Sequence, residues 1–335
     1  MAPLISSPFF NLLLISFTFL SFFLIKSYAL EGRKAIESHY HTVEISSLLP
    51  ASVCSPSTEG PNNRPSTLKV FHRHGPCSKH SQDKATPSLD EILSHDESRV
   101  DSIHFKINQN VDNDKIEDKK VIIPAQSGQS LGTGNYIPRK NYGKYFSYCL
   151  PSPSSSSGHL TFGNSGVSSN VKFTPFADSQ GTSFYFINIL GIGVGTTQLS
   201  ISPSVFKTAG TIIDSGTVIT RLPPQAYSAL STEFKKQMSK YPSAPAFSIL
   251  DTCYDLSNYT TITIPKISFT FDGNVKVDIV AMGTLIPVGS SRFCLAFAGN
   301  SDASDVGILG NVQQMTLEVV YDVAGGKLGF GPGGC

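Results

Sequence analysis

The 335-residue sequence contains no tryptophan and only four methionines, and charged residues make up just 15% of it. The formal net charge is +1, so the chain lacks the basic surface that binds nucleic acid, and we expect no nucleic-acid partner. Low charge combined with 28 Gly, 21 Pro and 22 Phe is typical of a β-rich extracellular protein. The length is enough for two domains of about 150 residues each.

Long apolar runs are also absent, except for one at residues 9–25 that is rich in Phe and Leu. Small residues follow at Ser27 and Ala29, as before a signal-peptidase cut. We therefore predict a signal peptide over residues 1–29, a secreted protein, and no membrane association after cleavage. A retained signal anchor is the alternative, because no Lys or Arg precedes the run.

The six cysteines include no Cys-x-x-Cys pair, which argues against a zinc ribbon or a redox dithiol. An even number behind a signal peptide favours disulfides. Between residues 30 and 120 charges and histidines are dense, and only residues 88–103 have apolar side chains at helical spacing. We expect this region to be partly disordered, with a weakly folded helical segment.

After Val121 the pattern changes to short β-type runs between Gly, Pro, Asn and Asp turns. The predicted strands cover residues 145–149, 159–162, 183–192, 210–213, 262–271, 275–280, 292–297, 317–322 and 327–330. One helix is predicted at 224–238, with Tyr227, Leu230, Phe234 and Met238 on one face. The fold class is therefore all-β.

The strongest chemical signal is the loop that begins at Asp214. An apolar, β-branched run leads into Asp214-Ser215-Gly216-Thr217, and a second apolar run follows it. Gly216 allows a tight turn, and the hydroxyls of Ser215 and Thr217 can fix the direction of the carboxylate. These four residues alone are also compatible with an Asx-type turn between strands.

About 90 residues downstream lies Ile308-Leu309-Gly310, two apolar residues followed by glycine. Together with the Asp214 loop, this resembles the C-terminal lobe of pepsin-like aspartic proteases of the plant nepenthesin-like branch. Further segments match in the same order, at residues 145–151, 184–187, 222–223, 251–255, 293–297 and 329–331. The upstream stretch 70–78 resembles the propeptide of that branch.

The resemblance implies a domain organisation and a set of site residues. It gives a signal peptide at 1–29, a propeptide at 30–126, a remnant of the N-terminal lobe with a deletion seam at 127–144, and a C-terminal lobe at 145–335. It makes Asp214 catalytic, with Ser215, Gly216 and Thr217 as its loop and Ile308, Leu309 and Gly310 as the strand that buttresses it. It also implies disulfides Cys149–Cys335 and Cys253–Cys294, and leaves Cys54 and Cys77 open.

No metal or other cofactor is implied. His72, His74, Cys77 and His80 have the residue types of a metal site, but membership of a propeptide is the simpler interpretation. Asn258 begins an Asn-Tyr-Thr glycosylation sequence, which agrees with secretion. The substrate of such an enzyme is a peptide or protein.

The second catalytic loop is missing from the sequence. Aspartic proteases use two carboxylates that share one proton, and the family takes the first from an Asp-Thr-Gly-Ser loop in the N-terminal lobe. Every Asp-Ser-Gly or Asp-Thr-Gly match in this chain reduces to Asp214. About 100–150 residues, one domain's worth, are absent between Tyr136 and Lys144. Alternative splicing and a faulty gene model both explain the seam.

We therefore expect an aspartic endopeptidase family member that is inactive as a monomer. Three alternatives stay open. One is a homodimer that builds the catalytic pair from two copies of Asp214. Another is a non-catalytic binding or inhibitor protein of the same fold, as plant xylanase inhibitors are. The third is a DNA-binding role like that of chloroplast-nucleoid relatives, which the neutral charge disfavours. The vacuole and the chloroplast are the alternative locations, and the oligomeric state is open.

Overall fold

The computed structural model is dominated by β-strands and describes residues 39–50, 54, 67–72, 75–77, 87–108, 144–152, 157–178 and 184–333. The expected signal peptide, nearly all of the expected seam, His74, His80 and Cys335 lie outside the described residues. None of the helices that the structure describes is both long and apolar enough to cross a membrane.

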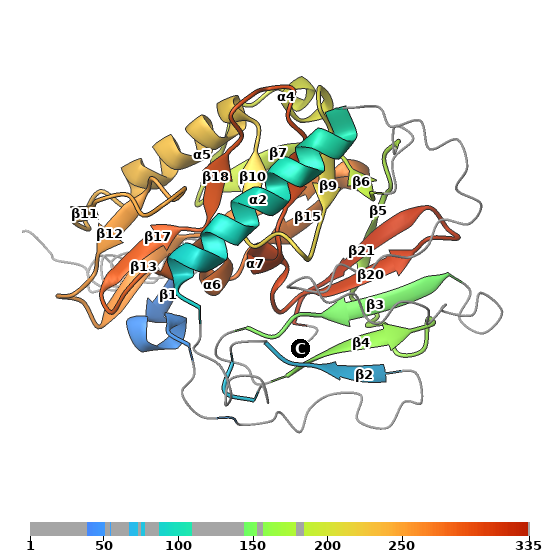
Figure 1. Ribbon diagram of the computed structural model, residues 1–335, viewed down its shortest axis with the longest axis horizontal. Coiled ribbons are helices and arrows are strands. Elements are labelled where there is room, and N and C mark those ends of the chain that lie inside the picture. Colours follow the sequence, from blue (N-terminus) through green and yellow to red (C-terminus); the bar gives the residue numbers. More distant parts are fainter. Residues whose placement is uncertain are drawn as a thin grey trace, which may run out of the picture.

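A six-stranded sheet forms one side of the molecule (Figure 1). All of its neighbouring strands pair antiparallel. In spatial order the strands are β2 (Thr67–Val70), β4 (Gly158–Phe162), β3 (Tyr145–Cys149), β20 (Glu318–Asp322), β21 (Lys327–Gly331) and β5 (Lys172–Pro175). Because β3 pairs with β20, the beginning of the expected lobe is joined to its end.

A five-stranded sheet carries the Asp214 loop. Its order is β18 (Phe297–Gly299), β10 (Thr220–Leu222), β19 (Gly307–Leu309), β9 (Thr211–Ile213) and β6 (Phe186–Ile187). Strands β9 and β19 run parallel, so their carboxyl ends meet at one edge of the sheet. Both are short, apolar and fully buried at Ile212 and Ile308, as expected for strands covered on both faces.

Two four-stranded sheets complete the domain. One has the order β15 (Val275–Asp278), β14 (Ile267–Phe271), β7 (Ile189–Val194), β8 (Thr197–Gln198); the other has β11 (Ser243–Ala244), β12 (Cys253–Asp255), β17 (Arg292–Leu295), β16 (Leu285–Pro287). The sheets share one apolar core, in which Phe271 stacks on Phe330 at 5.0 Å between ring centroids. Short helical turns connect them: α4 (Pro203–Lys207), α6 (Ala281–Thr284), α7 (Asn311–Gln314) and η3 (Asp272–Asn274).

The predicted helix at 224–238 is confirmed as α5 (Pro224–Gln237), with Met238 as its C-cap. Pro224 stands in the first turn, where a missing N–H costs no hydrogen bond. Leu230, Phe234 and Met238 are fully buried, which is the helical spacing that the sequence shows.

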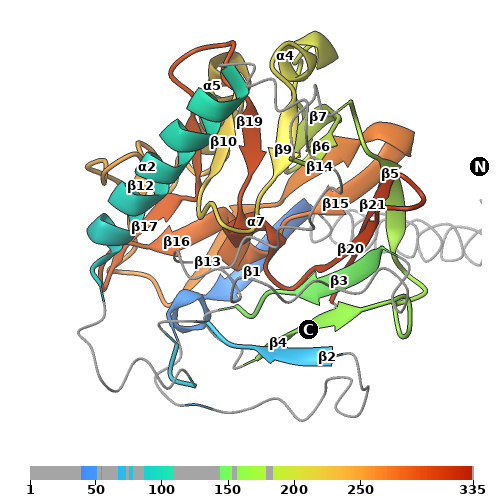
Figure 2. The same ribbon diagram turned by 45° about the vertical axis from the view of Figure 1, so that its right-hand side comes forward.

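The N-terminal region packs on this domain at three places. Strand β1 (Tyr40–Glu44) pairs with β13 (Thr261–Pro265) and is followed by the 3-10 turn η1 (Ile45–Leu48). Strand β2 extends the six-stranded sheet. Helix α2 (Leu89–Asn108) crosses the five-stranded sheet beside β10, β19 and β9 (Figures 1 and 2).

The expectation that the helical segment is weakly folded is wrong. Leu93, Val100 and Ile103 are at most 5% exposed and join the apolar clusters under α2. The helix begins with a capping box: the Ser88 backbone N–H donates to the Glu91 carboxylate at 2.7 Å, and the Glu91 N–H donates to the Ser88 hydroxyl at 3.2 Å.

The disulfide Cys253–Cys294 is confirmed and joins β12 to β17. Cys149 is also disulfide-bonded, while its expected partner Cys335 lies outside the described residues. Cys54 and Cys77, whose state the sequence left open, are bonded to each other. The sulfur of Cys77 is therefore unavailable to the metal-site alternative.

Removing the Cys253–Cys294 bond tests its contribution to the domain. The bond links residues 41 apart, and a loop of this length predicts a loss of roughly 4 kcal/mol in the free energy of unfolding. We expect Cys253→Ala/Cys294→Ala to lower the free energy of unfolding by this amount, and so to move the urea unfolding midpoint to a lower concentration, with the wild type as control. An unchanged midpoint would show that the bond adds nothing to stability.

Candidate active site

Asp214 lies where β9 ends, on the edge that β9 shares with β19. Its backbone N–H donates to the Leu309 carbonyl at 3.1 Å, which continues the parallel pairing of the two strands by one residue. The residue is 1% exposed. A buried carboxylate is costly unless it is paired and hydrogen-bonded, so its partners define the site.

The loop supplies two of those partners. The Thr217 hydroxyl donates to Oδ2 of Asp214 at 2.7 Å, and the Gly216 N–H donates to Oδ1 at 3.1 Å. Ser215 is buried beside them and interacts with the Tyr148 hydroxyl. The structure thus brings together the four loop residues that the sequence singles out.

The strand 308–310 passes directly behind this loop, as the resemblance implies. A side chain at Gly310 would lie 2.8 Å from the Val218 carbonyl oxygen and 2.9 Å from Thr220 N, so only glycine fits. The Gly310 N–H donates to the Thr220 hydroxyl at 2.9 Å, and the Asn311 N–H donates to the Thr217 carbonyl at 2.7 Å. These bonds fix the loop from behind.

Helix α2 covers the same loop from the other side. The Arg99 guanidinium donates two hydrogen bonds to Asp214, from Nε to Oδ2 and from Nη2 to Oδ1, each of 2.9 Å. This is the two-pronged geometry in which arginine binds carboxylates most strongly. A side chain at Gly216 would lie 2.5 Å from the guanidinium, so the loop glycine also leaves room for Arg99.

A second ion pair lies one turn earlier on α2, and here the helix carries the acid and the domain carries the arginine. Asp96 is 3% exposed; it accepts from Val218 N at 2.5 Å, from Ile219 N at 3.3 Å and from Nη2 of Arg221 at 3.2 Å. Burial raises the pKa of Asp96, and the Arg221 guanidinium opposes that rise. Burial likewise lowers the pKa of Arg221, against the effect of Asp96. Each charge therefore makes the burial of the other tolerable.

The far end of α2 is held by His104. One ring nitrogen, Nε2, lies 3.0 Å from the Val306 carbonyl oxygen, and the other, Nδ1, lies 3.8 Å from a carboxylate oxygen of Asp305. Between these polar contacts Val100 and Ile103 pack on Ile212 and Ile308, the residues that underlie the Asp214 loop. The helix is therefore fixed over the loop by three polar anchors and an apolar stripe.

Two tyrosines lie beside Asp214 on the six-stranded sheet. Burial raises the pKa of Tyr148, and the Asp214 charge acts in the same direction. Burial also raises the pKa of Tyr321 well above its ordinary value. The Tyr148 hydroxyl donates to Oε1 of Gln314 at 2.5 Å. Both phenols are therefore neutral hydrogen-bonding groups next to the carboxylate at any physiological pH.

The sequence did not reveal Asp96, Arg99 or His104 as parts of the site. One signal was present: Asp96 falls on the apolar stripe of the helix, between Leu93 and Val100, where a charged side chain needs a buried partner. Nothing in the local pattern identifies that partner as Arg221, which is 125 residues away along the chain.

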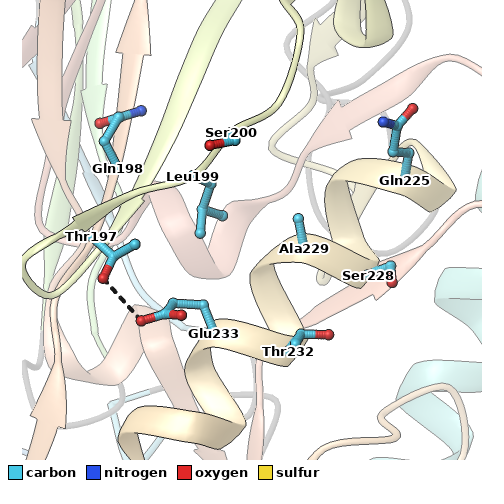
Figure 3. Close-up of a pocket in the computed structure, with 9 residues that line it drawn as sticks. All are labelled: Thr197, Gln198, Leu199, Ser200, Gln225, Ser228, Ala229, Thr232 and Glu233. Atoms are coloured by element: carbon cyan, nitrogen blue, oxygen red, sulfur yellow. Dashed lines mark hydrogen bonds between the residues drawn. The ribbon is translucent and has the colours of Figure 1, made fainter.

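The structure also contains an open groove away from the Asp214 loop (Figure 3). Its walls are β8 with the turn after it and one face of α5, and the Thr197 hydroxyl donates to the Glu233 carboxylate across it at 2.9 Å. Hydrogen bonds, chiefly from Gln237, lower the pKa of Glu233. No member of the Asp214 loop lines this groove.

Asn258, the expected glycosylation residue, is exposed in the turn between β12 and β13. Among the residues that the structure describes, no three His, Cys, Asp or Glu side chains are grouped as metal ligands are.

Comparison with known proteins agrees with the geometry. Residues 184–332 match the family model described as xylanase inhibitor C-terminal. The chain is 36% identical to an aspartyl protease family protein of Arabidopsis thaliana, over 91% of this chain and 95% of that protein. It is also 36% identical to the aspartic proteinase nepenthesin-2 of Nepenthes gracilis, over 57% of this chain and 45% of that protein.

The Arabidopsis alignment runs over 453 positions, although 91% of this chain is about 305 residues, so about 150 positions have no residue of this chain opposite them. Among solved structures, edgp matches with a TM-score of 0.50 and 19% identity, over 56% of this chain and 54% of that one, which shows the pepsin-like fold. On the relatives together with the geometry of the Asp214 loop, the chain belongs to the plant aspartyl protease family.

Proposed function

We propose that this chain is a secreted, non-catalytic member of the family, in which the one remaining catalytic aspartate is covered by its own N-terminal helix. The observation that carries the proposal is the pair of hydrogen bonds from Arg99 to the two carboxylate oxygens of Asp214. Family membership implies a peptide or protein substrate.

Peptide hydrolysis by this family needs two carboxylates about 3 Å apart. One takes a proton from the attacking water, and the other holds the proton that the leaving amine requires. Asp214 can supply one of the two. Its oxygens accept from Thr217, Gly216 and Arg99. Arg99 therefore occupies positions that a catalytic water and a proton-sharing carboxylate need.

The absence of a second loop supports the same conclusion. The sequence has a single Asp-Ser-Gly-Thr loop, and the roughly 150 unmatched positions of the Arabidopsis alignment are about the size of the missing lobe. A homodimer could supply a second Asp214 only after α2 leaves both copies, because Arg99 and Asp96 hold the helix over the loop.

A second candidate function is binding without catalysis, as an inhibitor or a recognition protein. It is favoured by the match of residues 184–332 to the xylanase inhibitor C-terminal model. It also agrees with the covered aspartate, because binding without hydrolysis does not require an exposed pair of carboxylates.

Secretion is supported by the disulfides Cys54–Cys77 and Cys253–Cys294, because such bonds persist in oxidising compartments. If residues 1–29 are a signal peptide, N-terminal sequencing of protein collected from the medium will start at Leu30. Protein that stays in membranes and begins at Met1 contradicts this.

The activity test uses a denatured protein substrate at about pH 3–5, with and without pepstatin, over about a hundredfold range of chain concentration. We expect no pepstatin-sensitive cleavage, because the second carboxylate is missing. Cleavage that disappears in Asp214→Asn and persists in Asp278→Asn, a control on an exposed aspartate of β15, would overturn the proposal. A steeper than linear dependence on concentration would then identify the homodimer.

The cover itself is tested by Asp96→Asn. The change leaves the Arg221 guanidinium buried without a counter-charge, which costs about 3–5 kcal/mol in comparable pairs. We expect the amide protons of Val218 and Ile219, which donate to Asp96, to exchange about a hundredfold faster or more.

The matched control is Asp101→Asn, because Asp101 is an exposed aspartate on the same helix. Its exchange pattern should equal that of the wild type. Equal protection in Asp96→Asn and wild type would mean that Asp96 does not hold the helix in place.

A further inference from the structure

Strand β1 lies at the edge of β13, far along the sequence from α2 and from the Asp214 loop. Five residue pairs are in antiparallel register, from Tyr40 with Pro265 to Glu44 with Thr261. Two flanking hydrogen bonds extend the pairing, from Ile45 N to the Thr260 carbonyl and from Lys266 N to the His39 carbonyl, each of 2.9 Å. Among the described strands, β13 pairs with β1 alone, so β1 supplies the hydrogen-bonding partners along this edge of β13.

Side chains of the segment reach three separate parts of the domain. The Tyr40 hydroxyl donates to Oε1 of Gln237 on α5 at 2.9 Å. His39 Nδ1 lies 3.1 Å from the Gly195 carbonyl oxygen, and His41 Nε2 lies 2.9 Å from the Ile279 carbonyl oxygen. A strand held only by its backbone could slide by two residues, whereas these contacts fix one register.

The receiving surface is shaped for this strand. Gln237 donates its amide N–H to the Val194 carbonyl at 2.8 Å while it accepts from Tyr40, and its side chain lies against Gly195. Gly195 has a φ of +57°, and a Cβ there would come within 2.2 Å of the Gln237 amide oxygen. The turn between β7 and β8 is thus built to let Gln237 reach the strand.

An apolar anchor follows the strand. Leu48, in the turn η1, is 2% exposed and belongs to the main core of the domain, and Val43, Ile45 and Leu49 pack against that core. The same arrangement is a known mode of peptide binding. An extended peptide adds a strand to the edge of a sheet and places a side chain in a pocket.

The covalent connections of this segment are few. Residues 51–53 separate it from Cys54, and the Cys54–Cys77 bond ties the next part of the chain to the stretch after β2. After a cut between residues 50 and 54, no peptide bond and, among the described residues, no disulfide would join residues 39–49 to the rest of the domain.

We propose that the edge of β13, together with Gln237, Gly195 and the core position of Leu48, is a strand-binding site, and that residues 39–49 stay bound in it after the chain is cut before Cys54. The cleaved protein is then a two-chain molecule with a non-covalent strand. The proposal does not depend on whether Asp214 is catalytic, so its test and the activity test fail separately.

The test replaces residues 51–53 in the full chain with the recognition sequence of a site-specific protease. After cleavage, which a denaturing gel verifies, we expect the N-terminal fragment to co-elute with the body in gel filtration at neutral pH. The proposal would be overturned if the fragment with unchanged residues 39–49 separated immediately after cleavage. It would also be overturned if the cleaved body dimerised through its open β13 edge.

Variants locate the binding contacts. Leu48→Ala removes the core anchor and should raise the rate of fragment loss by at least about tenfold. Tyr40→Phe removes one hydroxyl, cannot prevent folding, and should raise the rate about fivefold through loss of the Gln237 bond. Ser46→Ala, at an exposed position of η1, is the matched control and should behave as wild type. Equal rates in all four proteins would show that these contacts do not hold the segment.

Acid should loosen the segment. Burial lowers the pKa of His41; Lys266 acts in the same direction, while the Ile279 carbonyl and Asp278 oppose the shift. The docked strand thus favours neutral His41, and docking is full above the ordinary value near 6.5 and weakens as the pH falls through the lowered pKa.

We expect faster fragment loss at about pH 5 than at pH 7.5 in wild type, with a smaller difference in His41→Gln, which still donates a hydrogen bond but does not titrate. An equal pH dependence in both proteins would remove His41 from the binding site.

Discussion

The architecture around the site depends on a single requirement, that the buried carboxylate of Asp214 has enough donors. Strand pairing places Asp214 at the end of β9, where it is almost completely enclosed. An enclosed carboxylate is costly unless nearby N–H and O–H groups replace water. The loop supplies Thr217 and Gly216, and in this chain the remaining capacity is taken by Arg99. The helix that carries Arg99 is therefore as much a part of the site as the loop.

The same requirement explains why α2 packs closely on the domain. Its contacts with the domain alternate between apolar packing and ion pairs: Leu93, then Asp96, then Arg99 and Val100, then Ile103. The apolar residues supply most of the attraction, because Arg99 is partly exposed and its pair with Asp214 adds little, while desolvation offsets most of the gain from the buried Asp96–Arg221 pair. The pairs instead determine where the helix can bind, because a misplaced helix would bury Asp96 or Arg221 without a partner.

The sequence predicted the parts of the fold that local patterns encode. The loop at Asp214, the strand before it and the helix α5 follow from β-branched runs, glycine positions and helical spacing. The strand at 308–310 was expected only from the resemblance to the family. The resemblance to the family added the Cys253–Cys294 bond, which no spacing rule could have assigned.

Other features needed contacts between distant parts of the chain. A single strand was expected at 262–271, but the structure interrupts it at Lys266, whose N–H donates to the His39 carbonyl. The expected strand at 183–192 likewise breaks between β6 and β7 at Asn188, whose amide donates to Asp272 at 3.0 Å. No window of sequence contains both partners of such a contact, so the breaks could not be predicted.

The spacing of Asp96 and Arg99 has a consequence for how α2 can change. Residues three apart lie on one face of a helix, so the two charges reach Arg221 and Asp214 only in a single rotational setting. A continuous leucine stripe would allow the helix to slide by one turn, but this face carries two opposite charges that must each meet a specific partner. A one-residue insertion between Asp96 and Arg99 would rotate one of them by about 100° relative to the other. Either Arg221 or Asp214 would then stay buried without its partner on the helix.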